Sequence, residues 1–462
     1  MAALAGVAAL VRLPFLGSIG PDEGGYAYVA WEWARGHTLY SGVWVDRPQG
    51  LILVYRLLIS ISQSAWAIRL GAVVAGVAIT LLLVWVGRLL DGERAGLLAG
   101  GLFAVAGLGP HVEGFTFNGE LVAAVPSTAA VGAALVAWRR GSRRWLAAAG
   151  LLGGSALLMK QSGFDGLAVA LAVALAAKPR PARVGLVAAC AAVPVGASAL
   201  AGWLSGWQAY WTALVAYHFD PSTGPGRLVH LTQSLPVVAS DVLPLGVAAL
   251  VGLWMLRRSL ELRFALVWLG AALVGVNVGG LYWPHYYVQL LPPLCLLAGV
   301  ALARIRVPVL GWATAAVVAL PALAFLGSLL QASESSRESM VKYALGYEND
   351  QRVARYVRSH SSPADRVYAF ISRADFYFLA DREAASPYIW GHPLNTIPGA
   401  KAELARTLAE PRRPRLVVLF QRKPLEQRDR QVDATVDRYY VPVWRSPSRT
   451  TVLRERNPEP LG

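Results

Sequence analysis

The chain has 462 residues, of which 55% are hydrophobic and only 15% are charged, a balance that excludes an ordinary soluble domain. Leu, Ala, Val and Gly dominate in runs long enough to cross a bilayer core of about 30 Å, so we expect a polytopic membrane protein. The formal net charge of +15 does not require nucleic acid as a partner, because Arg and Lys gather between apolar runs. Cys190 and Cys295 both lie inside apolar runs, which argues against a disulfide framework.

The basic clusters fall in alternate connections, which is the pattern of cytoplasmic loops. They are Arg88/Arg94, Arg139–Arg144, Lys178–Arg183, Arg257–Arg263 and Arg304/Arg306. We therefore expect a cytoplasmic N-terminus, an extracytoplasmic C-terminal segment and no cleavable signal peptide. Arginine outnumbers lysine and alanine is abundant, which indicates a GC-rich bacterial genome and hence a location in the bacterial inner membrane.

Apolar segments of helical length predict about eleven membrane-spanning helices. They lie at roughly 1–17, 66–88, 95–110, 119–138, 145–160, 163–178, 184–204, 236–256, 264–281, 287–304 and 307–330. Residues 25–35 and 48–62 are shorter and bordered by polar residues, so we expect interfacial helices on the outer leaflet. One half of a re-entrant hairpin is the alternative for residues 51–61.

After residue 330 the composition becomes that of a soluble domain, rich in Ser, Glu, Arg and Pro. Periodicity predicts helices at 348–360 and 400–409 and strands at 366–371 and 415–420. The sequence thus predicts a transmembrane domain, 1–330, whose first outer loop spans 18–65, and a small extracytoplasmic α/β domain, 331–462.

The acidic pair Asp22-Glu23 directly follows the first apolar run, where the chain leaves the membrane. Adjacent carboxylates are costly in hydrocarbon, so the pair should lie at the interface. A poorly hydrated carboxylate there suits a general base that takes a proton from a hydroxyl group. Helix capping is the alternative, with Asp22 as the cap and Glu23 facing the helix dipole, and both roles can hold together.

Other outer loops carry single charged groups beside apolar runs. Arg47 suits a phosphate at the membrane surface, and equally a topology-setting or snorkelling arginine. Lys160 either marks the outer end of a span or binds an anion. Glu120 is a functional candidate within the first turn of its span, although a helix N-terminus also stabilises a carboxylate.

The aromatic run around His285 is typical of an interfacial belt, to which the imidazole adds a hydrogen-bonding group for a phosphate or sugar. We expect the short loops 111–118, 160–162 and 282–286 to converge on one cavity. The seven histidines show no ligand spacing, which argues against a dedicated zinc site. No nucleotide-binding fingerprint occurs, which argues against ATP or a nucleotide sugar as the direct substrate.

Together these motifs resemble a known family. Asp22-Glu23-Gly24-Gly25-Tyr26, Gly36-His37-Thr38-Leu39-Tyr40 and Arg47-Pro48-Gln49-Gly50 resemble the first outer loop of GT-C-fold glycosyltransferases. The nearest group is the dolichyl-phosphate-mannose-protein mannosyltransferase and aminoarabinose transferase superfamily in its bacterial form. Asn118-Gly119-Glu120, Lys160-Gln161 and the run from His285 to Pro293 are similar to later motifs of this superfamily. The order and spacing of the motifs carry the resemblance.

The resemblance implies a mainly α, GT-C-like bundle that moves a sugar from a polyprenyl-phosphate carrier to a hydroxyl or amine on the outer face, with inversion. It implies Asp22 as the catalytic base with Glu23 in support, and Arg47, Lys160 and His285 as ligands of the donor phosphate. The remaining substrate-binding candidates are Tyr26, His37, Tyr40, His111, Glu113, Asn118, Glu120, Gln161, Tyr286 and Tyr287.

The acceptor implied is a lipid, a cell-envelope glycan or a protein, and membrane lipids surround the bundle. No cofactor is expected, while a divalent metal stays open. The family usually carries Lys-Pro-Pro-Gly where this chain has Arg47-Pro48-Gln49-Gly50, so the charge is kept but the second proline is lost. A transporter, a flippase or a non-catalytic binding protein for lipid-linked sugars is the alternative, although the sequence lacks the paired halves usual in transporters.

Overall fold

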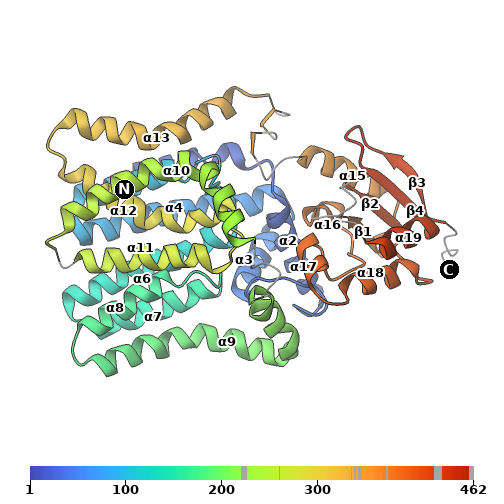
Figure 1. The fold of residues 1–462 in the computed structure, drawn as a ribbon, viewed down its shortest axis with the longest axis horizontal. Helices are drawn as coiled ribbons and strands as arrows, with labels where there is room; N and C mark the ends of the chain where they lie inside the picture. Colours follow the sequence, from blue (N-terminus) through green and yellow to red (C-terminus); the bar gives the residue numbers. More distant parts are fainter. Residues whose placement is uncertain are drawn as a thin grey trace.

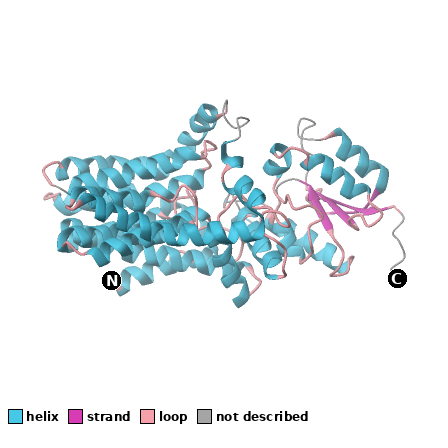
Figure 2. Cartoon of the chain, turned by 90° about the horizontal axis from the view of Figure 1, so that it is seen from below, coloured by secondary structure: helices cyan, strands magenta, loops and turns pink. Residues whose placement is uncertain are grey.

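The computed structural model describes residues 1–219, 226–259, 261–333, 336–337, 340–341, 346–370, 373–420 and 429–456. The chain forms a bundle of long helices joined to a smaller unit in which helices surround a sheet (Figure 1). Within the described part of the chain, strands lie only in this C-terminal unit, at the end of the molecule farthest from the bundle (Figure 2). The predicted fold class, a mainly α bundle with a small C-terminal sheet, is confirmed.

The bundle contains helices at all eleven predicted apolar segments. They are α1 (Ala2–Leu10), η1 (Leu13–Phe15), α4 (Ala65–Asp91), α5 (Glu93–Ala106), α6 (Gly119–Arg140), α7 (Arg143–Leu157), α8 (Asp165–Ala176), α9 (Arg180–Leu214), η2 (Ala216–Phe219), α10 (Arg227–Leu256), α11 (Glu261–Val278), η4 (Pro284–Leu290), α12 (Leu291–Arg304) and α13 (Pro308–Gln331). By length and composition, seven helical segments of the described chain can cross a membrane. The exact number of spans therefore stays a prediction.

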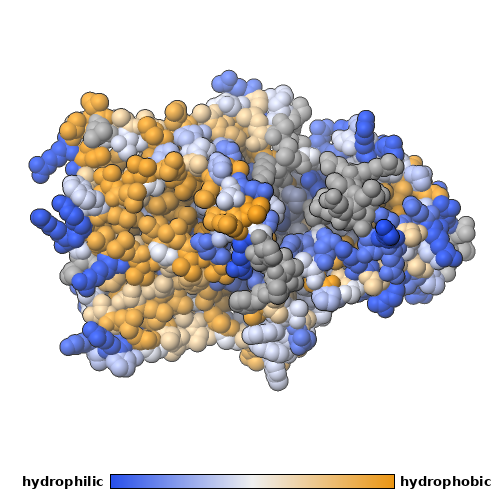
Figure 3. Space-filling view, viewed as in Figure 1, coloured by the Kyte–Doolittle hydropathy of each residue, from blue (hydrophilic) through white to orange (hydrophobic). Residues whose placement is uncertain are grey.

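The surface of the bundle is apolar, as a multi-pass membrane protein requires. Figure 3 shows hydrophobic residues over most of the bundle, with hydrophilic groups at its far end and over the C-terminal unit. Helix α9, for example, exposes Leu200, Trp203 and Leu204. A soluble protein rarely leaves so large an apolar area in water, so this surface faces lipid.

Two shorter helices, α2 (Pro21–Ala34) and α3 (Gln49–Ile61), form the first outer loop between α1 and α4. In α3 the exposed side chains Leu53, Leu57 and Ile61 recur at every fourth position, whereas Tyr55 and Ile59 are buried. This spacing places the apolar exposed groups on one face, which suits a helix that lies on a membrane surface.

The C-terminal unit is built from short elements around one sheet. They are α15 (Tyr347–Ser359), β1 (Val367–Phe370), α16 (Asp375–Ala380), α17 (Gly391–Thr396), α18 (Ala400–Ala409), β2 (Leu416–Leu419), α19 (Arg430–Tyr439), β3 (Tyr440–Arg445) and β4 (Thr451–Glu455). The strand order is β1-β2-β4-β3, with β1 and β2 parallel and the other pairs antiparallel. The two predicted helices and two predicted strands correspond to α15, α18, β1 and β2.

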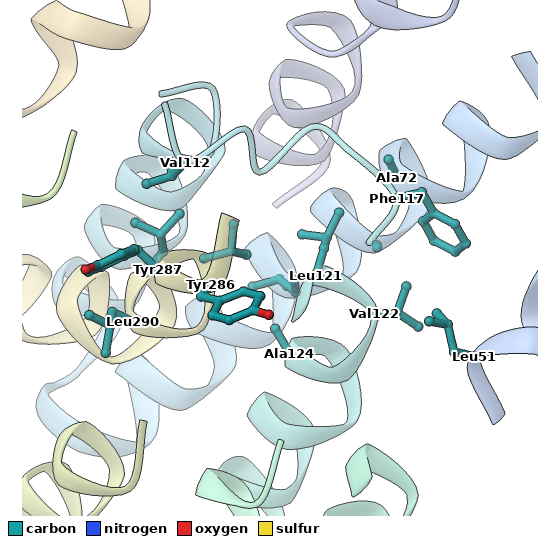
Figure 4. Packing of buried hydrophobic residues seen from close by; sticks show 14 of the residues in the cluster. Leu51, Ala72, Val112, Phe117, Leu121, Val122, Ala124, Tyr286, Tyr287 and Leu290 are labelled. Atoms are coloured by element: carbon teal, nitrogen blue, oxygen red, sulfur yellow. The ribbon is translucent and has the colours of Figure 1, made fainter. Parts of the chain in front are cut away.

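The core continues from the bundle to the outer loops. Figure 4 shows Leu51 of α3 near Phe117 and Val122, and Tyr286 of η4 near Leu121 and Ala124 of α6. These side chains belong to one buried hydrophobic cluster that also includes residues of α2 and α16. The loops at this end of the bundle are therefore held by packing as well as by hydrogen bonds.

Candidate functional site

The acidic pair lies in the first turn of α2, and its two members do different things. Glu23 accepts hydrogen bonds from the backbone amides of Gly20 (2.9 Å) and Phe117 (2.7 Å). Its Oε2 also lies 2.8 Å from Nη2 of Arg69, a buried side chain of α4. The capping function considered for Asp22 therefore belongs to Glu23, which reaches back to the N-cap residue Gly20.

Asp22 is partly buried and lines a cavity. The other lining residues are Gly20, Glu23, Thr116, Asn118 and His285. Its Oδ1 accepts a hydrogen bond of 3.1 Å from the indole Nε1 of Trp390, in the C-terminal unit. Burial raises the pKa of Asp22, and the nearby Arg47 and the Trp390 hydrogen bond only partly offset that rise. Asp22 is thus a more basic carboxylate than an exposed aspartate.

Lys160, Glu120 and His285 meet beside this cavity, although they come from three separate parts of the chain: Glu120 lies in the first turn of α6, Lys160 follows α7, and His285 lies in η4. Lys160 forms an ion pair with Oε1 of Glu120, and its Nζ lies 3.8 Å from the centre of the Tyr286 ring. Nε2 of His285 lies 3.7 Å from the same carboxylate oxygen. The start of α6, directly after the loop 111–118, therefore converges with the loops 160–162 and 282–286, and together they bring one carboxylate close to two nitrogen donors.

Glu120 and Lys160 also line a second cavity, toward the bundle. Ser162, Asp165 and Gln289 are its other polar lining groups. Asp165 accepts hydrogen bonds from Ser127 and Trp268, each 2.8 Å long. This floor is hydrogen-bonded within the protein, so it forms a fixed polar wall below the Lys160–Glu120 pair.

Arg47 pairs with its neighbour Asp46, and both side chains act electrostatically on Asp22. Its guanidinium carbon lies 5.9 Å from the centre of the Tyr26 ring. The Asp46 carbonyl accepts a hydrogen bond of 2.8 Å from Nε2 of Gln161, and the same nitrogen lies 3.1 Å from the ring of His218. Burial alone would raise the pKa of Asp46, but Arg47, His218 and Lys160 outweigh burial and lower it.

Several predicted substrate-binding residues contact other protein groups. Nδ1 of His111 lies 3.1 Å from Oδ1 of Asp241 in α10, and His37 lies 3.1 Å from Glu32 near the far end of α2. Tyr287 lies 2.8 Å from the hydroxyl group of Ser234. These contacts give His111, His37 and Tyr287 positions in loop and helix packing rather than in either cavity.

Three more predicted residues shape the loops that carry the site. Asn118 caps α6, because its Oδ1 accepts a hydrogen bond of 3.0 Å from Leu121 N. Tyr40 donates a hydrogen bond of 3.2 Å to the Arg47 carbonyl and so holds the loop that presents the guanidinium. Glu113 is buried in the turn before α6, where it has a left-handed backbone with φ of 48°.

Sequence reasoning missed Asp46, His218, Arg69 and Trp390. Asp46 directly precedes Arg47 in a loop already singled out, so the adjacent opposite charges were a usable signal. Arg69 is a lone cation near the start of an apolar helix, which is also a signal for a buried partner. No local pattern marks His218 or Trp390, because both reach the site only through the folding of distant segments.

A metal site is not evident in this region. Across the ranges that the structure describes, no group of three His, Cys, Asp or Glu side chains could hold a metal ion. Arg47 and Lys160 both act electrostatically on Asp22 and lower its pKa. The expectation that no cofactor is needed stays a prediction.

Comparisons with known proteins agree with this architecture. Residues 46–205 match the family described as dolichyl-phosphate-mannose-protein mannosyltransferase. The fold is similar to that of ArnT from Cupriavidus metallidurans bound to undecaprenyl phosphate, with a TM-score of 0.67 and 18% identity, over 98% of this chain and 96% of that one. It is also similar to the apo oligosaccharyltransferase of Archaeoglobus fulgidus, with a TM-score of 0.56 and 14% identity, over 99% and 74%.

A third solved structure, AglB from Archaeoglobus fulgidus with an inhibitory peptide and a dolichol-phosphate, gives a TM-score of 0.56 at 12% identity, over 99% of this chain and 74% of that one. No curated protein matches the chain by sequence. The chain therefore has the GT-C fold, and its predicted resemblance to the mannosyltransferase and aminoarabinose transferase superfamily is confirmed.

Proposed function

We propose that this protein is a membrane glycosyltransferase that moves a sugar from a polyprenyl-phosphate carrier to an acceptor hydroxyl or amine on the extracytoplasmic face. One observation carries the proposal: the partly buried carboxylate of Asp22 lies within the electrostatic reach of two buried cations, Arg47 and Lys160. This combination matches a reaction that needs a base and releases a phosphate. Arg47 and Lys160 also lie within the segment that matches the mannosyltransferase family.

The bond changes follow from the carboxylate of Asp22 and from the cations Arg47 and Lys160. Asp22 accepts the proton of the acceptor hydroxyl group, whose oxygen attacks the anomeric carbon from the side opposite the phosphate. The bond between the anomeric carbon and the phosphate oxygen breaks, its electron pair stays on that oxygen, and the configuration inverts. The polyprenyl phosphate leaves with an additional negative charge, which fixed cations stabilise without a proton donor.

The donor phosphate would replace the carboxylates that now pair with the cations of the site. In the structure Lys160 and His285 both face Glu120, and Arg47 faces Asp46. A guanidinium and an ammonium group already buried have lost most of their hydration, so a phosphate meets them at little further cost. Glu120 and Asp46 thus keep the cations in place until the donor arrives.

In this proposal Glu23 holds α2 in place through Arg69, and Asp22 alone acts as the base. Both carboxylate oxygens of Glu23 already accept hydrogen bonds from backbone amides, and Arg69 adds a charged partner. Burial raises the pKa of Glu23, but both of its carboxylate oxygens are held by these donors, so the group is not directed at the acceptor. The support predicted for Glu23 is therefore positional.

We further propose that the C-terminal unit, residues 331–462, is extracytoplasmic and that the N-terminus is cytoplasmic. The basic clusters support this orientation, because Arg88 and Arg304 lie in the last turns of α4 and α12. Hydrophilic groups gather at the end of the bundle away from the C-terminal unit (Figure 3). The proposed acceptor is a lipid, a cell-envelope glycan or a protein that approaches from that side.

The experiment that tests the function is the substitution Asp22→Asn in purified protein, given a panel of undecaprenyl-phosphate sugars and cell-envelope lipid acceptors. We expect transfer to fall by at least a hundredfold while undecaprenyl phosphate still binds, as measured by native mass spectrometry. Asp381→Asn is the matched control, because Asp381 is exposed and its left-handed backbone suits asparagine. Transfer at the wild-type rate in the Asp22 variant would refute the assignment of Asp22 as the base. If the wild-type protein binds the lipid but transfers no sugar, a transporter or binding protein would be favoured.

A further inference from the structure

The segment between α16 and α17 of the C-terminal unit runs along the first outer loop and touches it at three points. The backbone amide of Ala384 donates to the Tyr28 hydroxyl group at 2.7 Å. The carbonyl of Pro387 accepts a hydrogen bond of 3.1 Å from Trp44 N. The third contact is the hydrogen bond from Trp390 to Asp22, at 3.1 Å.

The Trp390 ring packs so closely against Gly25 of α2 that a larger residue at position 25 would clash with it. A Cβ atom at Gly25 would lie 2.4 Å from Cζ2 of Trp390 and 2.8 Å from Cβ of Ala374. The indole also packs against Tyr26, with ring centres 5.7 Å apart. Contacts with Gly25 and Tyr26 fix the ring, so the N–H group has a defined direction toward the carboxylate.

We propose that Trp390 is a positioning residue for the catalytic base, so that the C-terminal unit completes the active site. This inference rests on the proposed function of Asp22. The indole N–H holds one carboxylate oxygen, Oδ1, and leaves Oδ2 to face the acceptor proton. A carboxylate without this contact would rotate about its side-chain bonds, and only a fraction of its conformers would be productive.

The same hydrogen bond affects protonation. An N–H donor favours the ionised carboxylate and so lowers the pKa of Asp22, against the rise caused by burial. The charged groups that act on Asp22 are Arg47, Asp46, Lys160 and the adjacent Glu23, and the titratable His285 lines the same cavity. None of these groups lies in the C-terminal unit, so removal of the indole N–H should raise the pKa of Asp22 while leaving them in place.

The test is Trp390→Phe, which keeps an aromatic ring against Gly25 and Tyr26 but has no donor. Trp444→Phe is the matched control, because Trp444 is also a partly buried tryptophan of the C-terminal unit and stacks on Tyr356 at 4.5 Å. With an undecaprenyl-phosphate sugar that the wild-type protein consumes, we expect kcat to fall about tenfold or more in Trp390→Phe, with KM for the donor unchanged. The acidic limb of its pH profile should move to higher pH, and Trp444→Phe should change neither quantity.

A second variant moves the indole without removing it. Gly25→Ala places a methyl group against the ring, so it should reproduce the loss of kcat and the shift of the acidic limb. Gly196→Ala is its control, since no atom lies within 4 Å of a Cβ built there. The position of the acidic limb does not depend on how much protein is folded, so it remains informative if either variant is less stable.

The outcomes separate this inference from the proposed function. If Asp22→Asn transfers sugar like the wild type, the function fails and the inference fails with it. If Asp22 is required but Trp390→Phe matches Trp444→Phe in kcat and in its acidic limb, only the inference is refuted. A rise in KM with an unchanged kcat would also refute it, because Trp390 would then bind donor rather than orient the base.

Discussion

The pair formed by Lys160 and Glu120 gives a prediction that separates stability from function. Their side chains are only 10% and 2% exposed, so solvent screens the pair little. The substitution Lys160→Met keeps an unbranched side chain but removes its positive charge. Among the described ion pairs, the Glu120 carboxylate then keeps only its contact with His285, at 3.7 Å. Breaking a buried pair in this way costs about 3–5 kcal/mol, so the variant should unfold at a clearly lower temperature.

The second substitution tests whether that loss comes from the uncompensated charge. In Lys160→Met with Glu120→Gln no buried charge is left alone, so most of the lost stability should return. Binding of undecaprenyl phosphate should not return, because the cation that meets the phosphate is still absent, and we expect it to remain at least about tenfold weaker.

The assays are thermal unfolding in detergent and native mass spectrometry with undecaprenyl phosphate, each on the two variants and the wild type. Glu120→Gln alone completes the cycle and should retain the lipid. An unfolding temperature of Lys160→Met equal to that of the wild type would refute the buried-pair argument. Lipid binding by the double variant at the wild-type affinity would refute the role of Lys160 at the phosphate.

Three further predictions concern the same end of the bundle. Because burial raises the pKa of Asp22, kcat should be full above that raised pKa and should fall as the pH drops through it, at a pH above the ordinary aspartate value of about 3.9. An acidic limb at the ordinary value would contradict this. Arg69→Met leaves Glu23 unpaired and should destabilise the protein by about 3–5 kcal/mol in thermal unfolding, which unchanged unfolding would disprove. Gly50→Ala places a Cβ 2.6 Å from the Leu158 carbonyl oxygen, so α3 should shift and destabilise by about 1–3 kcal/mol, and an equally stable variant would show that α3 adapts.

The membrane helices were predictable because an apolar run of sufficient length has few alternatives in a bilayer. The elements α15, α18, β1 and β2 were also predictable, because their hydrophobic periodicity is a local property of the sequence. The hairpin of β3 and β4 was not predicted: β3 follows α19 without a break, and its Pro442 is unusual within a strand. No local signal therefore marked the place where the helix ends and the strand begins.

The polar loops were found one by one, but their partners were not. That Lys160 would meet Glu120 depends on how α6 and α7 pack, and the pair is 40 residues apart in sequence. The contact between Trp390 and Asp22 spans 368 residues and joins two units of the chain. Side-chain partners at such separations follow from the whole fold, which a single sequence without related sequences does not reveal.

The motif Asp22-Glu23-Gly24-Gly25-Tyr26 shows how one short pattern combines several requirements. Asp22 faces the cavity and Glu23 locks the helix start to Arg69. A Cβ at Gly24 would lie 2.4 Å from Cβ of Asp375 in α16, so this glycine lets α2 and α16 touch, as Gly25 does for Trp390. If the motif served catalysis alone, an alanine in place of either glycine would cost little. The close approach of the C-terminal unit explains why glycine is needed at both positions, and it ties the base to a domain more than three hundred residues away.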